Sequence, residues 1–219
     1  MKKMNIVYED SEIIVINKPS GLLSVSTLKE SENTLFHQVY TYLKQKHKNN
    51  KVFIVHRLDK DTSGLVLFAK NEKMKYLLQD NWDKLVINRE YIAVVEGVVK
   101  NTKTIKSWLK ETEALVSYSS LKPNDGKLAI TNYKSLTTNK SFSLLEIHIL
   151  TGRKNQIRVH MKDNGSPIVG DKKYGAKTNP IKRLGLHANK LELIHPITKK
   201  VMVFETKIPN EFIRMFPKK

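Results

Sequence analysis

The apolar residues of this chain come in short runs rich in β-branched side chains, and this pattern limits what the chain can fold into. The first two runs, at residues 6–7 and 13–16, stop at the turn signal 18–21 (KPSG), as expected for a pair of strands. Two compact runs, at 52–55 and 65–68, are predicted to form neighbouring buried strands. Further strand-like runs occupy residues 91–99, 129–136, 142–150 and 201–206.

Helical spacing is found in fewer places. It covers residues 35–43 behind Asn33 as a candidate N-cap, then residues 71–85, and then a stretch after Thr151 that should end near Asn164. Strands outnumber helices and do not alternate strictly with them. The sequence therefore predicts an α+β fold with a mixed, largely antiparallel central sheet flanked by helices and loops.

Size and hydrophobicity predict one domain. The chain has 219 residues, of which 40% are hydrophobic and 27% charged, which suffices for an apolar core. We expect a single domain over residues 1–219; a boundary within 109–127 is a weaker alternative. No segment approaches the ~20 apolar residues of a membrane helix, and the N-terminus lacks a signal-peptide core. A cytoplasmic protein without membrane contact is expected.

Charge and cysteine content narrow the chemistry. There are 39 Lys and Arg residues against 21 Asp and Glu, a formal net charge of +18, which favours a polyanionic partner. The chain has no cysteine, which excludes disulfides, thiolate zinc sites, iron–sulfur clusters and a cysteine nucleophile.

The densest polar cluster is residues 56–64 (HRLDKDTSG), between the two runs predicted to be buried strands. Asp59 lies between Arg57 and Lys60, and such cations keep a carboxylate ionised and available as a nucleophile or base. An Asx-type turn with surface ion pairs is the alternative interpretation. A second cluster, 151–160 (TGRKNQIRVH), brings cations to a helix N-terminus, which suits phosphate binding or, alternatively, a solvated amphipathic helix.

Together these clusters resemble the RluA-type family of RNA pseudouridine synthases. Residues 56–64 match its HRLDxxTSG signature and residues 151–160 its TGRxHQIRxH element. Further matches, in the family's order, are 17–22 (NKPSGL), 89–97 (REYIAVVEG), 170–175 (GDKKYG), 186–188 (LHA) and 195–196 (HP). The resemblance covers essentially the whole chain and implies a single pseudouridine-synthase catalytic domain.

The resemblance also implies a reaction and its residues. These enzymes break the N-glycosidic bond of a uridine and rejoin the base through carbon, without metal or organic cofactor. Asp59 matches the catalytic aspartate; whether it attacks the sugar, attacks the base or assists glycal formation stays open. Tyr91 matches the active-site tyrosine that would stack on the uracil, with a core aromatic as the alternative. Arg158 matches the arginine that pairs with the aspartate.

Base flipping and RNA contacts follow from the same resemblance. The target uridine must leave its stack, and Arg57 would fill the vacated space; an ion pair with Asp59 is its alternative. The other residues expected to contact substrate or RNA are His56, Thr62, Arg153, Asn155, Gln156 and Leu186. Asn155 departs from the family, which commonly has His there, so we interpret it as loop support and not an obligatory acid–base group.

Structured RNA, ribosomal or transfer, is the expected partner, with no obligate protein partner and a monomer as the default. We expect no counterpart, ahead of Lys18, of the small N-terminal RNA-binding domain of many relatives. RNA affinity is then expected from the catalytic domain, with the lysine-rich stretch 44–51 and Lys218-Lys219 as contributors. Two rival functions stay open: a non-catalytic RNA-binding or ribosome-assembly protein, and a histidine-dependent nuclease. The histidines lack metal-ligand spacing and are interpreted as structural.

Overall fold

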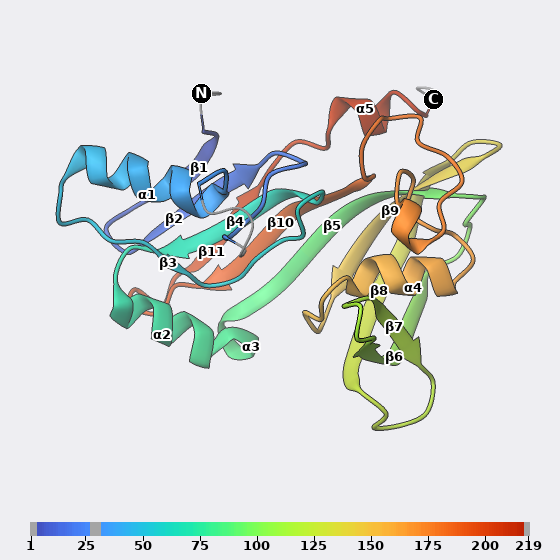
Figure 1. The fold of residues 1–219 in the computed structure, drawn as a ribbon, viewed down its shortest axis with the longest axis horizontal. Helices are drawn as coiled ribbons and strands as arrows, with labels where there is room; N and C mark the ends of the chain where they lie inside the picture. Colours follow the sequence, from blue (N-terminus) through green and yellow to red (C-terminus); the bar gives the residue numbers. More distant parts are fainter. Residues whose placement is uncertain (1–3, 27–31, 217–219) are drawn as a thin grey trace. The chain divides into compact units, whose positions relative to one another are not determined.

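The computed structural model describes residues 4–26 and 32–216, and within it the chain divides into two compact units. The first unit comprises Met1–Asn88 with Ala188–Lys207, and the second Arg89–His187 with Ile208–Lys219. The divisions fall inside strands β5 (Val86–Glu96) and β10 (Leu186–Ile194), so each of these strands contributes to both units (Figure 1). The chain does not divide at 109–127, where the sequence suggested a weak boundary, because that stretch lies within the sheet of the second unit.

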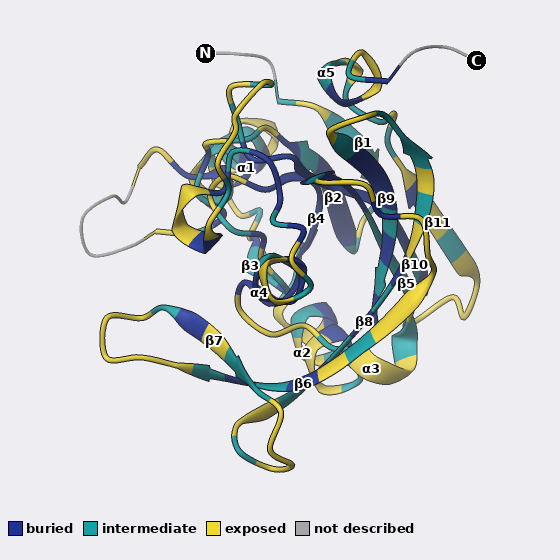
Figure 2. Cartoon of the chain, turned by 90° about the vertical axis from the view of Figure 1, so that its right-hand side faces the viewer, coloured by how far each residue is buried: buried dark blue, intermediate teal, exposed yellow. Residues whose placement is uncertain are grey.

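The first unit is built on strands in the order β1-β2-β4-β10, with β3 paired to β4 and β11 to β10. Besides β10, these strands are β1 (Ile6–Glu9), β2 (Ile13–Lys18), β3 (Phe53–Ile54), β4 (Ser63–Ala69) and β11 (Val201–Glu205). The predicted pairs β1–β2 and β3–β4 are both present and antiparallel. Every residue of β4 is buried, which is why its sequence is a continuous apolar run (Figure 2).

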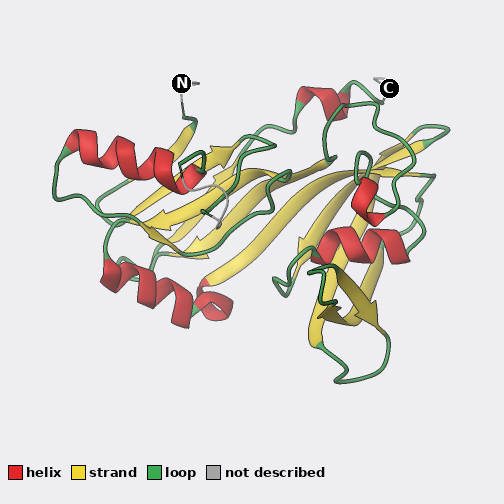
Figure 3. Cartoon of the chain, viewed as in Figure 1, coloured by secondary structure: helices red, strands yellow, loops and turns green. Residues whose placement is uncertain are grey.

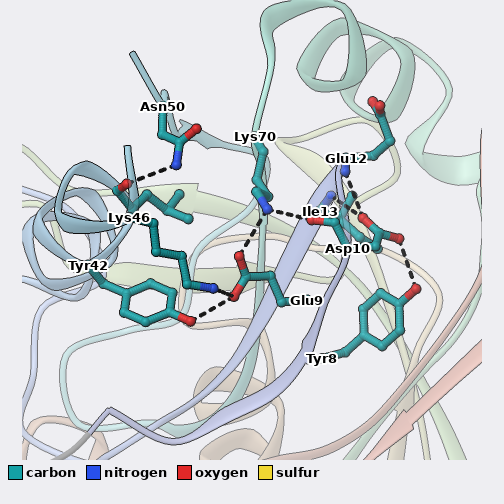
Figure 4. A network of polar contacts seen from close by, with 10 residues as sticks. Tyr8, Glu9, Asp10, Glu12, Ile13, Tyr42, Lys46, Asn50 and Lys70 are labelled. Atoms are coloured by element: carbon teal, nitrogen blue, oxygen red, sulfur yellow. Dashed lines mark hydrogen bonds and ion pairs between the residues drawn. The ribbon is translucent and has the colours of Figure 1, made fainter. Parts of the chain in front are cut away.

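Three helices accompany these strands: α1 (Leu35–Lys46), α2 (Glu72–Asp80) and α3 (Trp82–Leu85). Met74 and Leu78 of α2 pack into one apolar core with side chains of β2 and β4. Outside this core, Glu9 at the end of β1 accepts hydrogen bonds from Tyr42 and Lys46 of α1 and from Lys70 (Figure 4). This network fastens α1 to the first strand.

The second unit has a sheet in the order β5-β9-β8-β6-β7, with antiparallel pairing from β5 to β7. Besides β5, its strands are β6 (Lys103–Glu111), β7 (Ser117–Ser120), β8 (Lys127–Thr138) and β9 (Phe142–Ile149). Helix α4 (Gln156–Asp163), a short 3₁₀ turn (Lys172–Tyr174) and α5 (Asn210–Ile213) complete it. Ile157 and Met161 of α4 pack into the core formed with β5, β8 and β9.

The predicted α+β class is confirmed, with strands predominating over helices (Figure 3). Some local expectations were wrong. Thr34, not Asn33, caps α1, because the Thr34 hydroxyl accepts the amide of His37. The helical stretch 71–85 is two helices: the side-chain nitrogen of Asn81 donates to the Leu77 carbonyl at 3.0 Å, where the first helix ends. Within the described residues, no helix combines the length and apolar character needed to span a bilayer.

Candidate active site

Asp59 lies in the first unit, on the connection between β3 and β4. Its neighbours alternate between solvent and core: Arg57 and Lys60 are exposed, whereas Leu58 and Thr62 are buried. Asp59 itself is half-buried, and its carbonyl accepts the amide of Thr62 at 3.2 Å, which closes a turn behind it. The apolar runs on either side thus anchor a loop that brings its polar residues toward the surface of the unit.

The turn after β2 fastens this loop through its peptide groups. Lys18 is 0% exposed, and its ammonium donates to the carbonyls of Lys60 (2.8 Å), Leu22 (2.7 Å) and Pro19 (3.1 Å). The amide of Gly21 also donates to the Lys60 carbonyl, at 3.0 Å. Burial of an ammonium is costly unless its protons are all satisfied, so these bonds define the position of the loop closely.

Two serines from the same turn region hold the loop on both sides of Asp59. Ser24 Oγ donates to the Leu58 carbonyl at 2.7 Å and accepts the Leu58 amide at 3.1 Å. Ser20 Oγ donates to the Asp61 carbonyl at 2.6 Å. Together with Lys18, they leave little freedom to the backbone that carries Asp59.

At the start of β4 the backbone itself is tightly fitted. Gly64 has φ +116°, and a Cβ there would lie 2.2 Å from the carbonyl oxygen of Ala188. Only glycine satisfies both conditions. The glycine of the HRLDxxTSG signature is therefore explained by close approach of two strands within the first unit.

His56 contributes to the same framework. Its Nε2 accepts the backbone amide of Leu67 at 3.0 Å, and its ring lies 4.9 Å from that of Trp82. Both contacts support the loop from within the first unit. The RNA contact expected of His56 stays a prediction.

Tyr91 and Leu186 lie in the second unit. Tyr91, on β5, is partly buried, is paired with Ile147 of β9 and packs against the main core of this unit. Leu186 is 3% exposed and belongs to that same core. The structure thus fixes the positions of both side chains through packing.

The segment leading into α4 is fastened by Gln156. Its amide oxygen accepts from the Thr151 hydroxyl (2.7 Å) and from the Arg153 amide (3.0 Å). Its amide nitrogen donates to the Ile130 carbonyl and to Thr131 Oγ1, both at 3.0 Å. These four bonds explain why a glutamine begins the helix, whereas its expected contact with RNA stays a prediction.

Arg153 and Arg158 have different environments. Arg153 is exposed and its Nε donates to the Leu128 carbonyl at 2.9 Å. Arg158 instead forms a bidentate ion pair with Asp171, with Nε–Oδ2 at 2.7 Å and Nη2–Oδ1 at 2.8 Å. Of the predicted site residues, the structure brings Asn155 together with Arg158, whose Nη1 donates to the Asn155 side chain at 2.9 Å.

Two histidines from the sequence motifs are buried in the second unit. The ring of His160 lies between Thr131 Oγ1 (Nδ1, 2.8 Å) and Ser107 Oγ (Nε2, 2.9 Å), and burial lowers the pKa of His160 to about 4. Burial, and secondarily the charge of Arg183, lowers the pKa of His187 to about 4. Both rings are therefore neutral at physiological pH. The His160 ring bridges β6 and β8 through its two nitrogens.

Three potential metal ligands, Glu90, Glu146 and His148, approach one another on β5 and β9. Lys134 Nζ and His148 Nε2 both contact Glu146 Oε1, at 2.7 and 3.0 Å. Burial tends to raise the pKa of Glu146, but the hydrogen bonds from these two residues outweigh it and lower that pKa. A lysine already supplies the cation at this carboxylate, so the group does not favour a metal site.

Sequence reasoning missed Lys18 and Asp171 as parts of the site, since both belonged to segments interpreted as turns. A lysine two positions after the apolar run 13–16 was a usable signal for Lys18, because a charge there had to be either exposed or fully bonded. The basic stretch 44–51 includes Lys46, which is paired with Glu9. Lys218 and Lys219 lie outside the described residues.

Two solved structures of human pseudouridylate synthase domain proteins have a similar fold. Human RNA Pseudouridylate Synthase Domain Containing 4 is 24% identical, with a TM-score of 0.75, over 95% of this chain and 90% of that one. Human RNA Pseudouridylate Synthase Domain Containing 1 is 23% identical, with a TM-score of 0.74, over 94% and 84%. At these identities the likeness defines the fold, which is that of a pseudouridylate synthase domain.

The family follows from the sequence comparisons. A model of the RNA pseudouridylate synthase family matches residues 12–163. Ribosomal large subunit pseudouridine synthase C of Rickettsia prowazekii is 38% identical over 214 residues, 95% of this chain and 69% of the relative. The D enzyme of Haemophilus influenzae is 33% identical over 226 residues, 97% and 69%. This chain therefore belongs to the RNA pseudouridylate synthase family, in its RluA-type branch, and is an enzyme that modifies RNA.

Proposed function

We propose that this enzyme converts a uridine of large-subunit ribosomal RNA to pseudouridine, with Asp59 as the catalytic carboxylate. Two relatives at 33% and 38% identity are named ribosomal large subunit pseudouridine synthases, which supports this choice of RNA. The net charge of +18 supports binding to a polyanion, with affinity that falls steeply as salt rises.

In the proposed reaction the bond between the uracil nitrogen and the sugar C1′ breaks, and a bond between the base carbon C5 and C1′ forms. The proton on C5 is lost and the freed nitrogen gains one, so no atom is added or removed overall. The reaction calls for an ionised carboxylate held steadily against the nucleoside. Attack on the sugar, attack on the base and glycal formation are all consistent with this role of Asp59.

One observation carries the proposal for Asp59. The peptide groups on both sides of it, at Leu58, Lys60 and Asp61, are fastened by the turn after β2, while Asp59 itself is half-buried. Holding a backbone this firmly around one carboxylate is typical of a preorganised reacting group.

The other roles rest on the family motifs and on exposure. We assign Tyr91 to stacking on the flipped uracil and Arg158 to support of the Asp59 carboxylate. Arg57 is exposed on the same loop as Asp59, which suits insertion into the space that the flipped base leaves. Thr62 and Arg153 are assigned to the loop turn and to phosphate binding respectively. We assign the protein as a monomer in the cytoplasm.

The test is to map pseudouridines in ribosomal and transfer RNA from cells with and without the gene, and from cells that carry it with Asp59→Asn. The proposal expects one or more ribosomal sites to disappear in both mutant strains. Loss of transfer RNA sites alone would overturn the assigned RNA. Sites that disappear without the gene but persist with Asp59→Asn would overturn the role of Asp59.

A further inference from the structure

Arg158, on α4, is held by Asn155, immediately before its own helix, and by Asp171 and Tyr174 from one other segment of the second unit. Its Nε and Nη2 donate to the two oxygens of Asp171, and the side chains of Arg158 and Asp171 are 12% and 1% exposed. Removing two such charges from water costs several kcal/mol, and an apolar pair often stabilises a fold as well. The pair is therefore weak as a device for stability, and its geometry calls for another explanation.

Asn155 supplies a third bond to the same guanidinium. Its side-chain oxygen accepts from Arg158 Nη1 at 2.9 Å, and its amide nitrogen donates to Ser117 Oγ of β7 at 3.4 Å. The Asn155 backbone has φ 55°, in the left-handed region, where Asn is favoured among residues with a side chain. This backbone conformation places residue 155 immediately before α4, one turn from Arg158.

The aromatic ring of Tyr174 contacts the same guanidinium. The Arg158 guanidinium carbon lies 4.8 Å from the centre of the Tyr174 ring, in cation–π range. The Tyr174 hydroxyl accepts the backbone amide of Ser117 at 3.2 Å, so the ring is tied to the same strand that binds Asn155. We call Asp171, Asn155 and Tyr174 the guanidinium clamp.

Three of the five N–H donors of Arg158 are bonded to Asp171 and Asn155, and the Tyr174 ring fixes the plane. The directions of the other two N–H groups, one on each Nη, are thereby set. An arginine that must present a planar fork in one orientation needs this kind of support, since its side chain otherwise samples many rotamers.

We propose that Asp171 and Asn155 are positioning residues of the isomerase reaction, which act by fixing the direction of the Arg158 guanidinium. This inference rests on the proposed role of Arg158 as the support of the catalytic carboxylate. The two residues do not themselves touch the reacting atoms. Their effect falls on the chemical step and not on RNA affinity.

The kinetic test uses transcribed large-subunit ribosomal RNA with tritium at C5 of its uridines, and follows tritium release in single turnovers. We expect Asp171→Asn and Asn155→Ala to lower the limiting rate roughly 100-fold, the order expected for a small misplacement of a reacting group, while RNA affinity changes less than about threefold. Asn155→Asp keeps an acceptor oxygen and should recover most of the rate lost in Asn155→Ala.

Glu96→Gln is the matched control for damage to the loop that contains Asp171. Glu96 accepts the amides of Lys177 and Thr178, six and seven positions after Asp171. Within the part of the chain that the structure describes, it does not bond to Arg158. It should stay within about twofold of the wild type. If Glu96→Gln loses as much of the single-turnover rate as Asp171→Asn does, the effect of Asp171 comes only from the stability of its loop, and the inference is overturned.

A second readout is independent of activity. In protein with ¹⁵N-labelled arginine, the Nε–H signal of Arg158, assigned by its loss in Arg158→Lys, should show slow guanidinium rotation that becomes fast in Asp171→Asn. Fast rotation in the wild type overturns the inference. The inference is also overturned if Asp171→Asn keeps the wild-type rate while Asp59→Asn is inactive. That result would leave the proposed function standing. Full activity of Asp59→Asn would instead overturn the proposed function. The rotation measurement would still show whether the guanidinium clamp fixes the orientation of Arg158.

Discussion

The ion-pair network at Glu9 should contribute measurably to the stability of the first unit, and in a pH-dependent way (Figure 4). Glu9 Oε2 accepts from Tyr42 (2.8 Å) and Lys46 (2.9 Å), and Oε1 from Lys70 (2.9 Å). Burial tends to raise the pKa of Glu9, but the hydrogen bonds from Lys46, Lys70 and Tyr42 outweigh it and lower the pKa from 4.5 to about 2. The ionised carboxylate is therefore favoured in the folded state.

The size of the effect follows from this shift. A difference of about 2.5 pKa units corresponds to about 3 kcal/mol at neutral pH, as an upper limit. The Glu9 side chain is only 15% exposed, but that of Lys46 is 49% exposed and its pair with Glu9 is screened by water. We therefore expect Glu9→Gln to lower the free energy of unfolding by about 2 kcal/mol near pH 7.

The sign of the pH dependence is definite. Because the folded pKa is lower than the unfolded one, the contribution is fully present above pH 4.5 and is lost as the pH falls toward 2. In urea unfolding followed by Trp82 fluorescence in a Trp108→Phe background, the difference between wild type and Glu9→Gln should fall by more than half near pH 3.

Glu12→Gln is the matched control for this experiment. Glu12 accepts from the neutral amide of Asn71 at 2.7 Å, so loss of its charge should change stability by less than about 0.5 kcal/mol. The reasoning is refuted if Glu9→Gln and Glu12→Gln behave alike near pH 7. It is also refuted if the loss in Glu9→Gln is the same near pH 3 as near pH 7.

Two further predictions concern buried polar residues. Lys18→Met leaves the carbonyls of Pro19 and Leu22 without this donor and should lower the free energy of unfolding in urea by about 2–4 kcal/mol. The single-turnover rate should also drop, because the Lys60 carbonyl beside Asp59 is released. Unchanged stability would contradict the proposed loop support. Burial lowers the pKa of His160 from 6.5 to about 4, so its ring stays neutral in the folded state where the unfolded chain takes up a proton. The free energy of unfolding should therefore fall by up to about 3 kcal/mol as the pH drops from 6.5 to 4. His160→Asn should have a smaller pH slope over this range, and an equal slope in both proteins would rule out the effect.

Local sequence pattern predicted those parts of the fold where burial dictates residue type. The apolar run of β4 and the β-branched run of β2 were readable because both strands lie in the core of the first unit. Strands β6 and β7 were not, because they are rich in Lys and Ser and bury only a few positions such as Ser107 and Leu109. β6 pairs with β8, and β7 pairs with β6, so their place in the sheet depends on partner strands outside any short window.

In the candidate site, too, local motifs were readable and contacts between distant segments were not. The motifs identified Asp59, Tyr91 and Arg158 as candidates, but not what holds them. Asp171 is 13 positions from Arg158, and Lys60 is 42 positions from Lys18. Such contacts depend on how the chain returns on itself, which periodicity and spacing do not encode.

The role of Asp59 as the catalytic carboxylate is tested by comparing Asp59→Asn with Asp61→Asn in purified enzyme. Both substitutions remove one carboxylate from the same loop, and Asp61 is an exposed loop residue two positions further on. The readouts are pseudouridine formed in transcribed ribosomal RNA and the affinity for that RNA. We predict that Asp59→Asn loses on the order of 1000-fold or more in rate while keeping its RNA affinity, and that Asp61→Asn keeps both. Pseudouridine formation at the wild-type rate in Asp59→Asn would contradict this prediction.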